Sequence, residues 1–219
     1  MVTEKEPKFV LALDFGGTKL SAAIVNIENG EIAALIQKST PVQQGAAGTL
    51  EVMVATAKEV LGKFGRRDHV TQTGISFGGP VNQDRTAVLH SHHVADWDGI
   101  VLTEIMQDTF GMPAFMDNDA NAAALGEWYF GAGKRAQNML YIQVSTGIGA
   151  GLILDSHLYR GAALAGEFGH IIILPDGPAC VCGRKGCVES LCAGWAIARD
   201  GKEALKNASW TYKDSPRRK

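Results

Sequence analysis

The stretch Leu11–Thr18, LALDFGGT, is an apolar run that ends in a turn with two glycines, and Tyr141–Gly149, YIQVSTGIG, repeats this order. An apolar run of this length predicts a strand, and the glycines after it predict a tight turn. Recurrence of the same pattern in both halves of a chain indicates an internal repeat. We therefore expect two related α/β units, each beginning with a strand, a glycine turn and a second strand.

The first unit continues with a regular succession of elements. Lys8–Asp14, Leu20–Ile27 and Glu31–Ser39 predict three consecutive strands joined by short turns, that is, an antiparallel meander. Apolar periodicity then predicts a helix over 50–64, a strand over 70–77, a helix over 102–110, a strand over 113–116 and a helix over 120–130. Three meander strands followed by alternating helices and strands form a complete mixed α/β unit.

The second unit stops before this plan is completed. Strands are expected over 138–145, 151–155 and 170–174, with a helix over about 191–205, and the last residues, from Lys206, are polar. We expect an N-terminal lobe over residues 8–118 and a C-terminal lobe over 119–219 that lacks its final elements. Apolar faces left uncovered by such a lobe favour a homodimer or low solubility.

Composition excludes several classes of protein. The 219 residues carry a formal charge of -2, so the chain lacks the basic surface that nucleic acid or an anionic membrane would require. No apolar run approaches the ~18 residues that span a bilayer, and the charged Met1–Lys8 is unlike a signal peptide. We expect a cytoplasmic protein without nucleic-acid or membrane partners. Its 26 glycines, about 12% against an average near 7%, indicate many tight turns.

Both glycine turns have features of a phosphate site. In the first, Asp14–Lys19, backbone N–H groups of Gly16 and Gly17 could cradle a phosphate, with a hydroxyl from Thr18 and a cation from Lys19. The spacing matches neither a Walker loop nor a Rossmann fingerprint, and a plain hairpin explains this turn alone equally well. The second turn, with Thr146 and Gly147, favours a phosphate chain held between two lobes.

Five motifs in collinear order resemble the ROK family of sugar kinases and sugar-responsive repressors, with the bacterial glucokinases as the most similar branch. They are Asp14–Lys19, Asn118–Ala124, Ser145–Gly151, Gly166–His170 and Cys180–Glu189. The resemblance implies the actin-like ATPase fold, with two α/β lobes and the active site between them. It also implies ATP-dependent phosphorylation of a hexose, glucose in the first instance, as in glycolysis.

Phosphoryl transfer to a sugar requires positioning, charge neutralisation and one base. Asp119 is the candidate catalytic base, because it lies where a predicted strand meets a helix N-terminus, and the family assigns it this role. A plain N-cap would explain a lone Asp at this position; the Asn118-Asp119-Ala120-Asn121 context favours the base.

Sugar recognition requires polar groups that converge on hydroxyls. Asn118, Glu167, His170 and Glu189 fit this requirement, although Glu167 or Glu189 taken alone is more typical of a solvated surface. The resemblance implies that these residues bind the hexose together with Asp119 and the backbone of Gly78 and Gly79. It further implies that Asp14 holds Mg²⁺ through water, beside the nucleotide.

The four cysteines all lie within one short segment, which in a reducing compartment favours metal ligation over disulfides. Cys180, Cys182 and Cys187 provide three thiolates, and the family pattern places the fourth zinc ligand at His170, within a loop over 170–189. We expect a structural Zn²⁺ and place Cys192 outside it, as a buried helix residue. A redox thiol pair is the alternative, but Cys-x-Cys spacing is not typical of one.

Two other classes compete with a kinase. A sugar-sensing repressor would need a DNA-binding module, and only about eight residues precede the first predicted strand. A sugar- and zinc-binding ROK module with little or no turnover is the alternative function, because the second lobe is expected to be incomplete.

Overall fold

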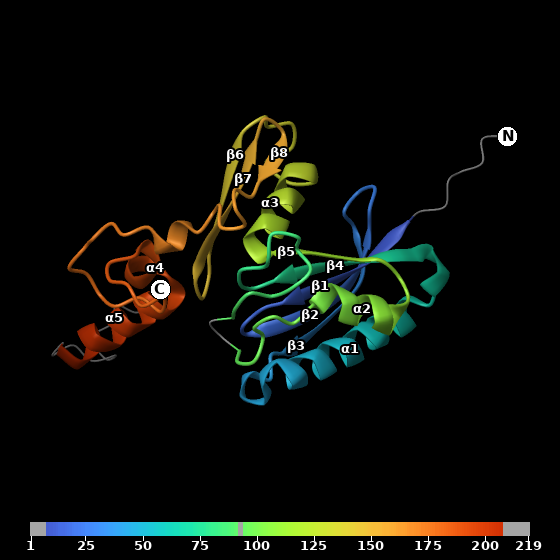
Figure 1. Ribbon diagram of the computed structural model, residues 1–219, viewed down its shortest axis with the longest axis horizontal. Coiled ribbons are helices and arrows are strands. Elements are labelled where there is room, and N and C mark those ends of the chain that lie inside the picture. The colour runs from blue at the N-terminus through green and yellow to red at the C-terminus, as the bar shows by residue number, and fades with distance from the viewer. Residues whose placement is uncertain (1–7, 92–93, 208–219) are drawn as a thin grey trace, which may run out of the picture. The chain divides into compact units, whose positions relative to one another are not determined.

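The computed structural model describes residues 8–91 and 94–207 and divides into two compact units. One unit combines the chain up to Tyr141 with Gly151–Gly166, and the other combines Ile142–Ala150 with the chain from Glu167 onward. Figure 1 labels their helices and strands. The division predicted from the sequence, at residues 118 and 119, concerns the complete two-lobed fold and stays a prediction.

The first unit is built on a five-stranded sheet in the order β3-β2-β1-β4-β5 (Figure 1). Its strands are β1 (Phe9–Phe15), β2 (Lys19–Asn26), β3 (Ile32–Ser39), β4 (Val70–Phe77) and β5 (Ala114–Asn118). β1 pairs antiparallel with β2 and parallel with β4, and β4 pairs parallel with β5. The predicted meander and both later strands are confirmed.

Register in the parallel part of the sheet contains one irregularity. Phe9 pairs with Val70 but Val10 with Gln72, so β4 has one extra residue at the start of the ladder. From there the register runs without interruption to Phe15, which pairs with Phe77.

Three helices accompany this sheet: α1 (Gly45–Phe64), α2 (Leu102–Phe110) and α3 (Asp119–Tyr129). Short 3-10 turns lie at Val42–Gln44 and Arg67–His69. The helices predicted over 102–110 and 120–130 are confirmed. The first helix begins five residues before the predicted start, because Gly45 and the small residues after it enter the helix before the apolar stripe begins.

The core of this unit lies on one face of the sheet. Alternate residues of β1, among them Leu11 and Leu13, are fully buried against α1 and α2, which contribute Met53 and Met106. Beside them Trp97 packs edge-on against Phe15 and Phe77, with ring centroids 5.7 Å and 5.0 Å away. The opposite face of the sheet therefore remains available for polar side chains at the strand ends.

The repeat expected in the second half begins as predicted. β6 (Met139–Val144), β7 (Ile148–Leu154) and β8 (His157–Tyr159) form a sheet in that order, and the glycine turn joins β6 to β7. Farther on lie a 3-10 turn over Phe168–His170 and the helices α4 (Val188–Cys192) and α5 (Gly194–Asn207). The one helix expected near residues 191–205 is thus two, and Ala193 separates them.

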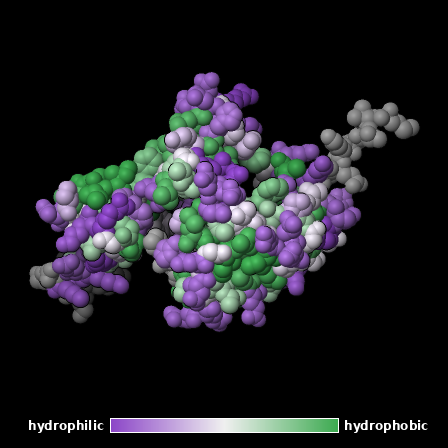
Figure 2. Space-filling model, in the orientation of Figure 1, coloured by the Kyte–Doolittle hydropathy of each residue, from purple (hydrophilic) through white to green (hydrophobic). Residues whose placement is uncertain are grey.

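The strand predicted over 170–174 is wrong. His170 closes the 3-10 turn, and the next residues are irregular apart from an isolated bridge between Ile172 and Cys187. Their backbone N–H groups bind the cysteine loop, since Ile173 and Leu174 both donate to the carbonyl of Gly186. Ile171–Leu174 remain exposed, and Figure 2 shows apolar surface on this unit. The predicted homodimer stays a prediction.

Across the described ranges, 8–91 and 94–207, no helix combines the length and the apolarity needed to cross a bilayer.

Candidate active site and metal centre

Three parallel strands end side by side at the carboxyl edge of the first sheet. Phe15, Phe77 and Asn118 lie in one register row, so the residues that follow them emerge at the same edge. These are the first glycine turn, the Gly78-Gly79 pair and Asp119. Ligands of open α/β sheets bind at such an edge. The fold therefore brings together these residues, which the sequence predicted for the phosphate and sugar sites.

One row further into the sheet, Asp14, Ser76 and Asp117 are register partners. The Ser76 hydroxyl donates to Asp14 Oδ1 at 2.8 Å. Burial raises the pKa of the Asp14 carboxyl, and the hydrogen bond from Ser76 partly opposes this. A half-buried carboxylate at this edge could hold a cation, whose charge would compensate for its desolvation.

The first glycine turn is held in place from within the unit. The N–H of Gly16 donates to the carbonyl of Lys19, and Thr40 at the end of β3 binds the turn twice. Its hydroxyl donates to the carbonyl of Gly16 at 2.7 Å, and its N–H donates to the carbonyl of Thr18. Thr18 and Lys19 are exposed, so their hydroxyl and ammonium groups are accessible to a ligand.

The junction between β5 and α3 fixes Asn118 and Asp119. Asn118 Oδ1 caps α3 by accepting from the N–H groups of Ala120 and Asn121, while its Nδ2 donates to the carbonyl of Gly79 at 3.1 Å. The predicted N-cap function thus belongs to Asn118. Asp119 Oδ2 lies 3.9 Å from the point where a Gly78 side chain would begin, so the carboxylate faces the glycine pair.

Asp119 also accepts the N–H of Ala120 at 2.9 Å, through Oδ1. Tyr141 is another neighbour in this unit. Burial raises the pKa of its phenol, and the negative charges of Glu127 and Asp119 raise it further. A carboxylate at a helix N-terminus, next to backbone glycines, can accept a proton from a bound hydroxyl group.

Two further residues lie beside this junction, Asp117 and Arg160, and neither was predicted from the sequence as a site residue. Asp117 is a buried carboxylate at the end of β5, and Arg160 follows β8. The guanidinium donates to Asp117 Oδ2 from Nε at 2.8 Å, with a second nitrogen 2.7 Å from the same oxygen. The position of Asp117 next to Asn118 was a usable signal, but no sequence pattern singled out Arg160.

In the second unit the glycine turn after β6 packs on α4. Glu189 is buried, and its Oε2 accepts the N–H of Ile148 at 3.0 Å. A side chain on Gly147 would begin 2.7 Å from the same oxygen, so any larger residue would require the Glu189 carboxylate to move. The N–H of Gly194, at the start of α5, donates to the carbonyl of Ser145. Thr146 itself is exposed.

Glu167, His170 and three cysteines gather in the same unit. Nε2 of His170 lies 4.0 Å from the Glu167 carboxylate, while its Nδ1 lies 3.7 Å from Cys180 Sγ. The Cys182 and Cys187 sulfurs are 3.7 Å apart, and the ligand atoms of His170 and the three cysteines lie within 4.8 Å of one another. Tetrahedral Zn–S bonds of about 2.3 Å place sulfurs about 3.8 Å apart, so this Cys₃His set fits zinc.

The thiols of this cluster differ in acidity. Burial raises the pKa of Cys180 to about 12. Burial also opposes ionisation of Cys182, but hydrogen bonds with Arg184 and with the other two cysteines outweigh it and lower that pKa to about 6. One thiol is thus ready to ionise, which assists the binding of a cation.

Glycine makes the cysteine loop sterically feasible. Gly183 and Gly186 have φ of 85° and 68°, in the region that other residues avoid. Cys192 lies outside the cluster, as expected, but it is exposed and not buried. Its thiol lies on the outer side of the short helix α4, where it donates to the carbonyl of Val188.

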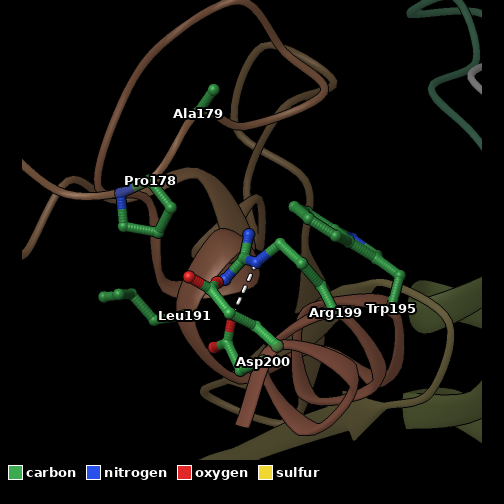
Figure 3. A pocket seen from close by; sticks show the side chains of 7 residues that line it. Pro178, Ala179, Leu191, Trp195, Arg199 and Asp200 are labelled. Carbon is green, nitrogen blue, oxygen red and sulfur yellow. Dashed lines mark hydrogen bonds and ion pairs between the residues drawn. The ribbon is translucent and has the colours of Figure 1, made fainter. Parts of the chain in front are cut away.

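Residues of α4 and α5, together with Pro178 and Ala179 of the cysteine loop, line an open surface hollow of about 610 Å³ (Figure 3). The Arg199 guanidinium carbon lies 5.2 Å from the centre of the Trp195 ring. Arg199 also donates to the carbonyl of Ser190 and to Asp200. Because these contacts engage Arg199, it packs α5 onto α4.

The predicted site residues therefore fall into two groups, each assembled within its own unit. The first unit gathers Asp14, Gly16, Gly17, Thr18, Lys19, Gly78, Gly79, Asn118 and Asp119 around one sheet edge. The second gathers Thr146, Gly147 and Glu189, and Glu167 with the metal ligands His170, Cys180, Cys182 and Cys187.

This fold is the actin-like ATPase fold, shared with sugar kinases of known structure. The chain belongs to the ROK family, whose model matches residues 10–214. It is 38% identical over 195 residues to a glucokinase of Streptomyces coelicolor, a match that covers 88% of this chain and 59% of that protein. The resemblance and the fold class predicted from the sequence are confirmed.

A solved ROK glucokinase from Streptomyces griseus, in complex with glucose and AMPPNP, superposes with a TM-score of 0.81 at 35% identity. The match covers 91% of this chain and 62% of that one. A xylose repressor of Bacillus subtilis is also similar, 38% identical over 63% of this chain and 35% of the repressor. The chain spans about three fifths of the length of the glucokinases that it matches.

Proposed function

We propose that this protein transfers the terminal phosphoryl group of ATP to a hydroxyl of a hexose, with glucose as the first candidate. The observation that carries the proposal is the position of Asp119. Its carboxylate faces Gly78 at an edge where three strands of a ROK fold end in one register. Similarity to a glucokinase that binds glucose and AMPPNP supports the choice of substrates.

In this proposal Asp119 is the general base. It accepts the proton of the sugar hydroxyl while the hydroxyl oxygen forms a bond to the terminal phosphorus of ATP. The bond between that phosphorus and the bridging oxygen breaks, and ADP leaves with the electron pair. Asn118 supports the reaction by capping α3 and binding the carbonyl of Gly79, which fixes the backbone on both sides of the sugar.

The proposed hexose contacts and the proposed nucleotide contacts each include residues of both groups. We assign the hexose to Gly78, Gly79, Asn118, Asp119, Glu167, His170 and Glu189, and the nucleotide phosphates to Gly16, Gly17, Thr18, Lys19, Thr146 and Gly147. Asp14 would hold Mg²⁺ through water, and the cation would neutralise phosphate charge. The burial of Glu189 against Ile148 supports a second function for its carboxylate, that of holding the phosphate turn.

We assign a structural Zn²⁺ to His170, Cys180, Cys182 and Cys187. Four protein ligands leave no open position, so the ion would stabilise the loop and take no part in catalysis. Its effect on substrate binding would pass through His170, whose Nε2 faces Glu167. We also propose that the protein is cytoplasmic and forms a homodimer, and that it has no nucleic-acid or membrane partner.

A coupled assay with a panel of hexoses, including glucose, mannose and N-acetylmannosamine, tests the activity. We expect sugar-dependent ADP release, and we expect Asp119→Asn to reduce kcat by about 10²- to 10⁴-fold without unfolding the protein. Asp108→Asn, a change of an exposed carboxylate on α2, is the matched control and should leave turnover unchanged.

Full activity in Asp119→Asn would refute the base assignment. Calorimetry on the same preparations tests the second candidate, a sugar- and zinc-binding module without turnover. The observation behind that candidate is the cluster of His170 with three cysteines, with Glu167 beside the imidazole, which requires no nucleotide. Glucose binding together with absent ADP release would establish it.

A further inference from the structure

The structure assigns a positioning function to the ion pair of Asp117 and Arg160: it holds the β5–α3 junction so that the Asp119 carboxylate keeps its place at the sheet edge. This inference rests on the proposed function, because it names Asp119 as the group to be placed. Neither Asp117 nor Arg160 lies among the substrate, nucleotide or metal residues assigned above.

Asp117 has an unusually complete set of partners for one carboxylate. Oδ1 accepts from the N–H of Asn118 at 2.9 Å and from Asn121 Nδ2 at 3.0 Å. Oδ2 accepts from Arg160, with Nε 2.8 Å away and a second nitrogen at 2.7 Å. The carboxylate side chain is only 12% exposed. A charge buried to this degree depends on its partners, because water cannot replace them.

The two asparagines that bind Asp117 flank Asp119 in the sequence. Asn118 and Asn121 stand on either side of it, and both bind the same oxygen of Asp117. Asn118 in turn caps α3 and binds the carbonyl of Gly79. The ion pair therefore anchors the residue before Asp119 and the first turn of the helix after it, and it reaches the glycine pair through Asn118.

Arg160 supplies the positively charged partner of Asp117, which the β5–α3 junction itself lacks. It comes from the segment after β8, distant in sequence, and approaches the end of β5 from outside the junction. Two nitrogens of the guanidinium hold Oδ2 while Asn118 and Asn121 hold Oδ1, and these contacts together fix the position and the orientation of the carboxylate. A lysine could provide the charge at this point but not the two-nitrogen geometry.

Two variants test the inference: Arg160→Gln and Arg160→Lys. Misplacement of a reacting group by about 1 Å costs on the order of 10²-fold in rate, so we expect Arg160→Gln to lower kcat by 10- to 100-fold. KM for the sugar should change by less than about threefold, since no substrate contact is removed. Arg160→Lys should recover only part of the loss.

Amide hydrogen exchange gives a readout that does not require turnover. The N–H groups of Asn118, Ala120 and Asn121 all donate to side chains of this junction. We expect their exchange in Arg160→Gln to accelerate at least about tenfold while amides of β1 are unaffected. Lys38→Gln is the matched control: it removes an exposed ion pair of the same unit, with Glu59 at 2.8 Å, and should change neither kcat nor these amides.

The outcomes separate the inference from the proposed function. Absence of sugar-dependent turnover in the unmodified chain would refute the kinase, while the exchange comparison would still test the positioning pair. Unchanged kcat and unchanged exchange in a folded Arg160→Gln protein would overturn the inference. A lower Tm with unchanged kcat and unchanged exchange at these three amides would reduce the pair to a stabilising contact. Should Arg160→Gln fail to fold, Arg160→Lys, which keeps the charge, decides by the same criteria.

Discussion

Asp14 and Asp119 are half-buried carboxylates at the same edge of the sheet, and their surroundings give them different chemistry. Asp14 lies within β1, is bound by a single hydroxyl and has a raised pKa. Asp119 is the first residue of α3, where its Oδ1 accepts the N–H of Ala120 and its Oδ2 faces Gly78. One carboxylate is suited to a cation, and the other to accepting a proton.

Removing the charge of Asp14 should stabilise the free protein. A raised carboxyl pKa means that folding favours the protonated form, so ionised Asp14 lowers stability at neutral pH. We predict that Asp14→Asn raises the Tm at pH 7 by a few degrees. This gain should shrink as pH falls through the raised pKa towards 3.8, because Asp14 then becomes neutral as well.

Calorimetry of the variant and the parent across this pH range measures the effect. The same substitution should lower any ATP-dependent activity by more than about tenfold, because the cation site is lost. Equal Tm values at pH 7 would show that burial of Asp14 carries no energetic cost, and the assignment of its raised pKa would then be wrong.

At the scale of elements, the turn between β6 and β7 depends on its contact with α4. Gly147→Ala would place a methyl group where Glu189 Oε2 now lies, and would thereby disturb the bond between that carboxylate and Ile148. We predict a loss of about 1–3 kcal/mol in the free energy of unfolding, the usual cost of overpacking, together with weaker nucleotide binding. Denaturant unfolding and nucleotide titration measure the two effects.

Gly201→Ala in α5 of the same unit is the control for a glycine-to-alanine change, since a side chain at that position would meet no atom within 4 Å. If Gly147→Ala and the control variant have the same free energy of unfolding, the packing of this turn on α4 does not stabilise the fold.

At the scale of the whole molecule, the second unit has few buried apolar side chains, and its order should depend on the metal. Ile171–Leu174 and Val181 are exposed, and the cysteine loop supplies much of the regular bonding between them. We predict that chelation or Cys182→Ser lowers both the Tm and the affinity for sugar, because His170 joins the metal set to Glu167.

Metal analysis, calorimetric unfolding and sugar titration on the same samples test this coupling. Cys192→Ser, which changes an exposed thiol outside the cluster, should retain the metal and the sugar affinity. Normal sugar affinity in a protein verified to be free of zinc would refute the coupling.

The sequence alone predicted those parts of the molecule that local patterns determine. Apolar residues alternate along β1 and β4 and form a stripe on α2. These patterns identify the strands and the helix, because each element buries one face against a single core. The segment over 170–174 misled the same reasoning: four apolar residues resemble a strand, but their N–H groups bind a loop closed by cysteines. Likewise, Arg160 could not be found, since its function depends on a contact across 43 residues of sequence.

The extra residue in β4 opposite Phe9 and Val10 has a consequence for how this chain tolerates changes of length. If Thr71 instead paired with Val10 and the ladder ran regularly from Phe9–Val70, Asp14 would stand beside Ile75, whose side chain points into the core, and not beside Ser76. The irregularity lies at the start of the β1–β4 ladder, remote from the polar edge. The extra residue is therefore accommodated there, and the pairing beyond it is regular. Insertions near Thr71 are therefore the ones that evolution or an engineer could accommodate, while a single insertion after Gly74 would separate the three strand ends.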